Sequence, residues 1–156
     1  MRKFIYTVGL AVLLTACSSD KPKTESPEEE AYETASSPAA EPVDDGKGVG
    51  PVKNVTLGAL DEGKAAKGKA IYEMKCQACH RLDDQKVVGP GWKGVTTRRK
   101  PEWIMNIILN VDEMLAKDPE AVKLVEAYLM KMPNQNVTEE EAYQILEFMR
   151  QNDGVK

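Results

Sequence analysis

Apolar residues recur at helical spacing in four stretches of the chain, and no stretch alternates in the manner of a strand. The first helix is expected to begin at Asp61 or Glu62, because acidic residues suit a helix N-terminus, and to end near Lys75. Gly68 falls inside this helix, where glycine costs about 1 kcal/mol relative to alanine. We therefore expect Gly68 to have a packing role.

Each of the other three helices has a start signal. Pro101 stands at the first turn of one, residues 118–120 form the Asp-Pro-Glu start of another, and residues 138–141 form a capping box before the last, which should end near residues 153–154. A loop with several glycines is expected from 81 to 100. The expected inward-facing positions are Trp103, Ile104, Ile107, Ile108, Val122, Val125, Leu129, Ala142, Ile145, Leu146 and Met149. The fold class is therefore predicted to be all-α.

The first 17 residues have the features of an export signal. Two basic residues precede an apolar run over residues 4–14, which is too short for the roughly 20 residues that span a bilayer. The run ends in Leu-Thr-Ala-Cys, which resembles the bacterial lipobox. Residues 1–16 are thus predicted to be a lipoprotein signal peptide and Cys17 the lipidated residue. The alternatives are an ordinary signal peptide cleaved near Ala16, and a short uncleaved anchor.

Lipidation of Cys17 would place the protein outside the cytoplasm, on the periplasmic side of a bacterial membrane. Ser18 follows, where an aspartate is often linked to inner-membrane retention, so the outer membrane is slightly favoured. Residues 18–55 lack apolar periodicity and carry nine acidic residues against four lysines. Residues 17–60 are accordingly predicted to be the lipidated cysteine and a disordered acidic linker, glycines 46–50 included. Residues 61–156 remain as one folded domain.

Charge argues against nucleic-acid binding by this domain. Residues 56–156 hold 15 basic and 16 acidic side chains, whereas a nucleic-acid-binding domain is strongly basic. The three consecutive basic residues at 98–100 are a local exception to this charge balance.

The most specific chemistry lies in the sequence Cys-Gln-Ala-Cys-His. On a helix, Cys76, Cys79 and His80 would project from one face, because they stand three and four residues apart. A porphyrin on that face could take a thioether from each cysteine, and the histidine could reach its iron. This is the pattern of c-type haem attachment.

Three other interpretations of this pattern compete with haem attachment. A structural zinc site needs four ligands, and the chain has three cysteines and one histidine in all. A thioredoxin-like pair should sit near a βαβ unit, and no strand is evident. A Cys76–Cys79 disulfide would leave His80 unexplained.

A second axial ligand would have to be methionine, because His80 is the one histidine of the chain. Met74 is in the motif helix, Met105 and Met149 stand at core spacing, and Met114 is expected in a loop close to acidic residues. Met132 precedes a proline, which favours extended backbone, in the loop before the last helix. Met132 is the predicted ligand. Met130 and an open sixth site remain as alternatives.

Beyond the haem motif, residues 61–151 resemble the class I cytochromes c. The chain has the family's spacing of glycine, aromatic residue, two cysteines and histidine, and also its Gly-Pro loop with a following arginine. The matching residues are Gly68, Tyr72, Cys76, Cys79, His80, Gly89, Pro90, Gly94 and Arg98. Trp92 departs from the family's usual leucine, and no glycine-rich segment leads into Met132.

The resemblance implies a class I cytochrome c fold of about four helices around one covalent haem c. In that family the glycine and aromatic residue pack the first helix on the last, here against Leu146 and Phe148 or Met149. The Pro90 carbonyl would accept a hydrogen bond from His80. Arg98, and less directly Trp103, would pair with a haem propionate.

The implied function is a membrane-tethered electron carrier rather than an enzyme. Alternatives are a gas-binding or peroxidase-like haem protein with an open site, a haem subunit of a larger respiratory reductase or oxidase, and a structural lipoprotein with a disulfide. Residues 103–150 are also faintly similar to small lipoprotein cytochromes of nitrous oxide reductase systems. The expected partners are therefore redox proteins, such as that reductase or an oxidase.

Overall fold

The computed structural model describes residues 45–156. The predictions for the signal peptide, for Cys17 and for residues 18–44 lie outside the described part. Within it, every regular element is a helix, as predicted. None of these helices is long and apolar enough to cross a membrane.

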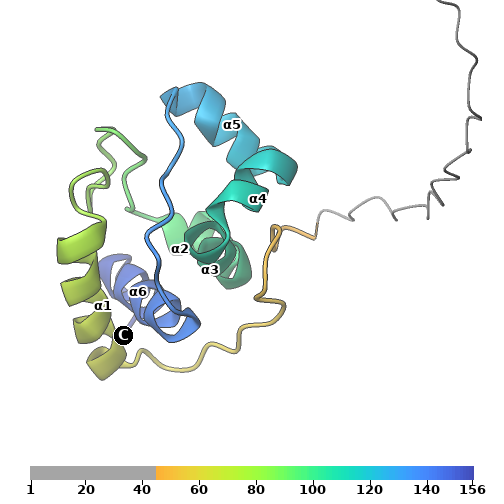
Figure 1. Ribbon diagram of the computed structural model, residues 1–156. Coiled ribbons are helices and arrows are strands. Elements are labelled where there is room, and N and C mark those ends of the chain that lie inside the picture. Colours follow the sequence, from red (N-terminus) through yellow and green to blue (C-terminus); the bar gives the residue numbers. More distant parts are fainter. Residues whose placement is uncertain (1–44) are drawn as a thin grey trace, which may run out of the picture. The chain divides into compact units, whose positions relative to one another are not determined.

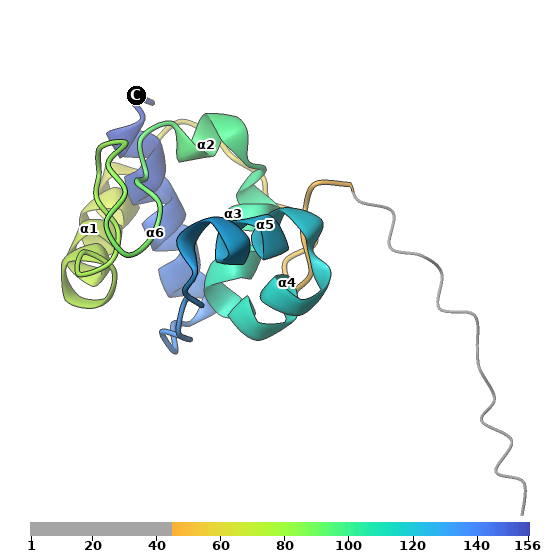
Figure 2. The same cartoon turned by 90° about the horizontal axis from the view of Figure 1, so that it is seen from above.

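Six helices make up the described part (Figure 1). They are α1 (Glu62–Lys75), α2 (Val95–Arg98), α3 (Pro101–Leu109), α4 (Val111–Lys117), α5 (Pro119–Tyr128) and α6 (Glu139–Asn152). Seen from above, α1 and α6 lie side by side, and α3, α4 and α5 lie beyond α6 (Figure 2). The four expected helices are α1, α3, α5 and α6. The single turn α2 and the short α4 were not expected.

Side-chain caps begin three of these helices where the sequence predicts them. Asp61 accepts from the Lys64 backbone N–H at 2.9 Å, and Asp118 accepts from that of Ala121 at 2.8 Å. Thr138 and Glu141 form a reciprocal capping box before α6. Each cap satisfies backbone donors that the first helical turn leaves without intrahelical partners.

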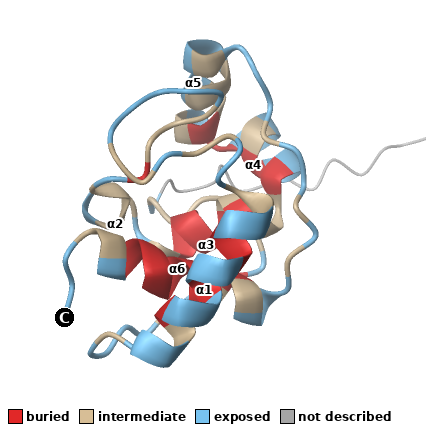
Figure 3. Ribbon diagram, turned by 90° about the vertical axis from the view of Figure 1, so that its left-hand side faces the viewer, coloured by how far each residue is buried: buried red, intermediate tan, exposed pale blue. Residues whose placement is uncertain are grey.

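The crossing of α1 and α6 is the central packing contact. A Cβ atom at Gly68 would lie 2.0 Å from the Gln144 carbonyl oxygen and 2.9 Å from the Ile145 nitrogen. Only glycine allows this approach of two backbones. Buried residues lie on α1, α3 and α6 (Figure 3), and α1 and α3 each pack against α6. The predicted packing role of Gly68 is confirmed.

One turn after Gly68, Tyr72 packs its ring against the C-terminal half of α6. Its ring centre lies 5.5 Å from that of Phe148 and 4.8 Å from that of Trp92. The resemblance implies Leu146 and Phe148 or Met149 as partners of Gly68 and Tyr72. Gly68 itself meets the backbone of Gln144 and Ile145, so the crossing lies just before Leu146. Phe148 is a partner of Tyr72, as the family resemblance implied.

Residues 45–60 pack on the domain, so the prediction of a disordered linker through residue 60 is wrong for this segment. Val52 is buried, and its backbone N–H and C=O both bond to the amide side chain of Asn106 at 2.9 Å. Glu102 accepts from the Val55 N–H at 3.0 Å. A Cβ at Gly50 would lie 2.3 Å from Asn106 Oδ1, so a glycine that suggests a linker instead permits close packing.

Two further expectations are corrected by the structure. Met114, expected in a loop, is fully buried in α4, and its sulfur accepts from the Val49 N–H at 2.9 Å. Leu129, expected on the apolar face of its helix, instead ends α5 in a left-handed conformation and is 88% exposed. Helical periodicity does not show where a helix stops, and α5 stops one residue before Leu129.

Gly68→Ala is expected to lower the free energy of unfolding by about 3 kcal/mol, at the upper end for an overpacked core, because the new methyl group meets backbone that cannot rotate away. Guanidinium unfolding of the haem-loaded protein measures this. Gly58→Ala is the matched control, since a Cβ at Gly58 meets no atom within 4 Å. A loss within about 0.5 kcal/mol of the control would contradict the packing role.

Asn106→Ala is expected to release residues 45–55, since it leaves three backbone groups of that segment without partners: Val52 N–H, Val52 C=O and Lys47 C=O. The loss of stability should be about 3 kcal/mol, because buried unsatisfied groups cost about 1–3 kcal/mol each. Amide hydrogen exchange should speed up in 45–55 but not at the α1–α6 crossing. Asn54→Ala, at an exposed position in the same segment, is the control.

Candidate functional site

The motif Cys76–His80 forms a hydrogen-bonded turn that continues α1. The His80 N–H donates to the Cys76 carbonyl at 2.9 Å, which keeps the helical four-residue relation between these two positions. The Cys79 N–H donates to the same carbonyl at 3.1 Å, in the tighter three-residue pattern. The motif therefore lies on one turn, although α1 itself ends at Lys75.

Both thiols are free and half-buried. Burial raises the pKa of Cys76 to about 11, and the neighbouring Lys75 opposes this rise only in part. The Cys76 thiol is thus protonated at neutral pH, unlike the thiolate that a reactive redox cysteine requires. Among residues 45–156, no group of three or more His, Cys, Asp or Glu side chains is arranged to hold a metal ion.

The imidazole of His80 is fixed by a backbone carbonyl. Nδ1 lies 2.9 Å from the Pro90 oxygen, and this contact is the one that the family resemblance implies. Burial lowers the pKa of His80, and the bond to Pro90 opposes the shift. A neutral ring must donate through Nδ1 to this carbonyl, which leaves Nε2 with a free lone pair. No residue of the described part bonds to Nε2.

Gly89 forms a wall against the His80 ring. A Cβ atom at this position would lie 2.6 Å from His80 Cε1 and 2.9 Å from Nδ1. The Gly89 N–H also donates to the Cys79 carbonyl at 2.9 Å. The loop is therefore bonded to the motif at two successive positions, Gly89 to Cys79 and Pro90 to His80. The sequence identified Gly89 only as part of a loop motif. The sequence did not predict its contact with the imidazole of His80.

Two aromatic residues complete the surroundings of His80. The Tyr72 hydroxyl donates to the His80 carbonyl at 2.8 Å, and burial raises the pKa of Tyr72, so the hydroxyl stays a donor. The Trp92 ring centre lies 5.6 Å from that of His80. Because Tyr72 also contacts Phe148, the α1–α6 interface and the histidine are joined by one side chain.

The methionines of the described part fall into three classes by burial. Met105, Met114 and Met149 are in the core, at 2%, 0% and 4% exposure. Met74 and Met130 are exposed, at 78% and 57%. Met132 is half-buried in the non-helical segment between α5 and α6.

The two residues expected near a haem propionate, Arg98 and Trp103, differ in how readily they could bond to one. Arg98 is exposed at the end of α2, and its guanidinium donates to the Lys93 carbonyl at 2.5 Å. Trp103 is buried and its indole N–H donates to Asp118 at 3.1 Å, so a bond from Trp103 to a propionate would require loss of this contact. Within the basic run, Arg99 is used internally, in an ion pair with Glu120 at 3.0 Å.

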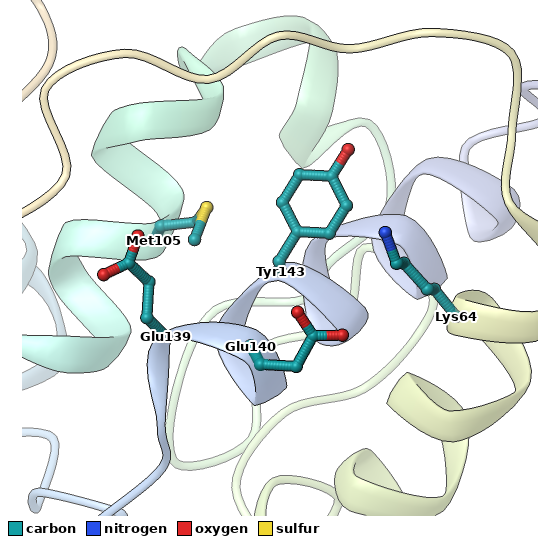
Figure 4. Close-up of a pocket in the computed structure, with 5 residues that line it drawn as sticks. All are labelled: Lys64, Met105, Glu139, Glu140 and Tyr143. Atoms are coloured by element: carbon teal, nitrogen blue, oxygen red, sulfur yellow. The ribbon is translucent and has the colours of Figure 1, made fainter.

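Two cavities of the described part differ in their place relative to the motif, and the second reaches Gln77 of the motif itself. One of about 370 Å³ is lined by Lys64 of α1, Met105 of α3, and Glu139, Glu140 and Tyr143 of α6 (Figure 4). The other, of about 690 Å³, lies beside the Tyr72 end of α1 and the loop that follows the motif. Neither is lined by Cys76, Cys79 or His80.

Comparison with known proteins decides the family. The model of the family described as cytochrome c matches residues 65–153. The chain belongs to the cytochrome c family. Comparison with curated proteins gives no match.

Solved structures agree with this family. Cytochrome c from Rhodothermus marinus is 41% identical, with a TM-score of 0.65, and the match covers 67% of this chain and 90% of that one. An engineered form of that cytochrome, bound to a carbene intermediate, is also 41% identical, with the same coverage and a TM-score of 0.62. A prokaryotic membrane lipoprotein lipid attachment site matches residues 1–18, which indicates an exported, membrane-anchored protein.

The side chains at the motif fit the cofactor of this family. Two unpaired thiols stand three residues apart on one turn, beside a neutral imidazole whose Nε2 is unbonded. The cofactor of the cytochrome is therefore one covalent haem c, with Cys76 and Cys79 in the attachment motif. Sequence reasoning did not identify Gly89 as a contact of His80. Its only signal was its place directly before the proline that holds the ring.

Gly89→Ala is expected to push the His80 ring from its place and weaken its bond to Pro90. The oxidised protein should then gain high-spin character, and stability should fall by about 1–3 kcal/mol, as for other overpacked sites. Absorption spectroscopy and guanidinium unfolding measure the two effects. Val88→Ala, at the exposed position next to it, should change neither.

Proposed function

We propose that this cytochrome is an electron carrier with His80 and Met132 as the axial ligands of its haem. The observation that carries the proposal is the fixed, neutral imidazole of His80, with Nδ1 held by Pro90 and Nε2 unbonded. Haem c supplies a one-electron couple between Fe(II) and Fe(III). The chain supplies the attachment cysteines, a rigid proximal ligand and a low-dielectric surrounding.

The rigidity of the proximal side suits electron transfer. Pro90, Gly89 and Tyr72 hold the ring or the backbone of His80 through three separate contacts. A ligand that cannot shift keeps the structural change between the two oxidation states small. None of these residues is a proton donor or nucleophile placed for chemistry on a substrate.

Burial supports Met132 over the other methionines as the distal ligand. The three core methionines are held within the packing between helices. Met130 is largely exposed, whereas Met132 is half-buried in the same segment. The proline that follows Met132 restricts its backbone to extended conformations, which suits a strap across a haem face. A methionine ligand raises the reduction potential.

The proposed setting is the periplasmic side of a bacterial membrane, with the lipid on Cys17 as anchor and the outer membrane slightly favoured. The lipid attachment match supports anchoring. The proposed partners are redox proteins on the same side, such as a terminal reductase (that for nitrous oxide among them) or an oxidase. Such encounters bury small areas and are brief.

Met132→Ala tests the ligand assignment. The variant should lose the far-red methionine-to-iron absorption of the oxidised protein, bind carbon monoxide rapidly when reduced, and lower its potential by on the order of 0.1 V, within the roughly 0.8 V that axial ligands span. Spectroscopy and redox titration measure these changes.

Met130→Ala is the matched control in the same segment, and it should leave all three properties unchanged. If wild type already binds carbon monoxide rapidly, and Met132→Ala alters nothing, the sixth site is open and the protein is a gas-binding or enzymatic haem protein. Haem that dissociates in acid–acetone would contradict covalent attachment.

A further inference from the structure

The segment between α5 and α6, residues 129–138, begins and ends at unusual backbone. Leu129 and Asn136 have φ of 54° and 48°, and in the described part they are the two non-glycine residues with positive φ. Figure 1 shows the segment as a non-helical stretch that runs from the end of α5 to the start of α6. We call residues 129–138 the strap. Met132 lies between its two left-handed residues.

Packing holds the strap at Val137, which contacts the core, but not at its first bend. Leu129 is 88% exposed, although a left-handed backbone is unfavourable for a branched side chain. Most of the strap residues are exposed as well. Local hydrogen bonds contribute to both bends: the Leu129 N–H donates to the Val125 carbonyl at 2.8 Å, and the Asn136 N–H donates to Asn134 Oδ1 at 2.8 Å. A lysine from outside the strap adds a contact at each bend.

Lys86 holds the first bend. Its ammonium donates to the Ala127 carbonyl at 2.6 Å, two residues before Leu129, and lies 4.3 Å from the Tyr128 ring centre. The Ala127 carbonyl belongs to the last turn of α5, where carbonyls lack intrahelical donors and a cation is favoured. Lys86 stands in the loop between His80 and Pro90.

Lys75 holds the second bend. Its ammonium donates to the carbonyl of Gln135 at 3.1 Å and to that of Asn136, the left-handed residue itself, at 3.4 Å. Lys75 is half-buried, ends α1 and directly precedes Cys76. The strap is thus tied at both bends to the two segments that flank the haem motif.

We propose that Lys75 and Lys86 are positioning residues that clamp the strap at its two bends and so keep Met132 on the haem iron. This inference rests on the proposed axial role of Met132. Each lysine binds backbone carbonyls of the strap or of the helix turn before it, so each acts on the strap irrespective of side chains there. Neither lysine contacts the methionine.

The experiment uses haem-loaded Lys75→Met, Lys86→Met and the double variant, which keep the length of the side chain and remove its donor and charge. In the reduced protein, carbon monoxide binds only when Met132 leaves the iron. Each single variant should bind it about tenfold to a hundredfold faster than wild type, as loss of one charged hydrogen bond implies, and the two effects should multiply in the double variant. The far-red methionine band should weaken in the same order.

Three controls make the outcome decisive. Lys69→Met removes another lysine of α1, whose ion pair with Glu73 does not touch the strap, and should behave as wild type. Lys75→Arg keeps a donor and should restore most of the slow binding. Guanidinium unfolding shows whether a variant is destabilised as a whole. Loss of global stability could speed carbon monoxide binding, but it would not weaken the methionine band at guanidinium concentrations far below the unfolding midpoint.

The outcomes separate the two proposals. If Met132→Ala abolishes the methionine band but the Lys75 and Lys86 variants match Lys69→Met, the clamp is refuted and the axial role stands. If wild type has no methionine band, the axial role fails first and the clamp fails with it. Fast carbon monoxide binding in both lysine variants, with arginine rescue at 75, supports the clamp.

Discussion

Where α1 crosses α6, the two backbones approach so closely that only a hydrogen atom fits between them. Gly68 supplies that hydrogen, and the Gln144 carbonyl lies where any side chain would begin. One turn later Tyr72 contacts Phe148 of α6 and donates to the His80 carbonyl. The position of His80 therefore depends on the crossing, since α1 carries both Gly68 and Tyr72 and runs directly into the turn that holds the histidine.

The surroundings of the haem motif are built mainly from backbone groups. The Pro90 carbonyl fixes the imidazole, and the Cys79 carbonyl accepts from Gly89. A strap carbonyl accepts from Lys75, and a carbonyl in the last turn of α5 accepts from Lys86. Backbone groups vary little when side chains change, so such a site tolerates sequence drift in its loops. Gly89 is the exception, because any side chain at this position would collide with the His80 ring.

The sequence predicted the four main helices, their caps and the attachment motif, because each depends on residues close together in the chain. It did not predict α4, whose seven residues are shorter than the periodicity needs, or the end of α5 at Leu129. It also misassigned residues 45–60 as linker. The composition of that segment is that of a linker, and its order comes from Asn106 and Glu102, about 50 residues away. The contacts of Lys75 and Lys86 could not be predicted from the sequence either, because their partners lie 41 to 61 residues away and are brought near only by the fold.

The docking of residues 45–55 onto α3 has a mechanical consequence for an anchored protein. A pull arriving from the N-terminal side reaches the bonds to Asn106 and Glu102 before it reaches α1. These bonds join the incoming chain to α3, whereas α1 is the helix that leads into the haem motif. In a protein anchored through its N-terminal end, a pull on the chain would load α3 before it reached α1.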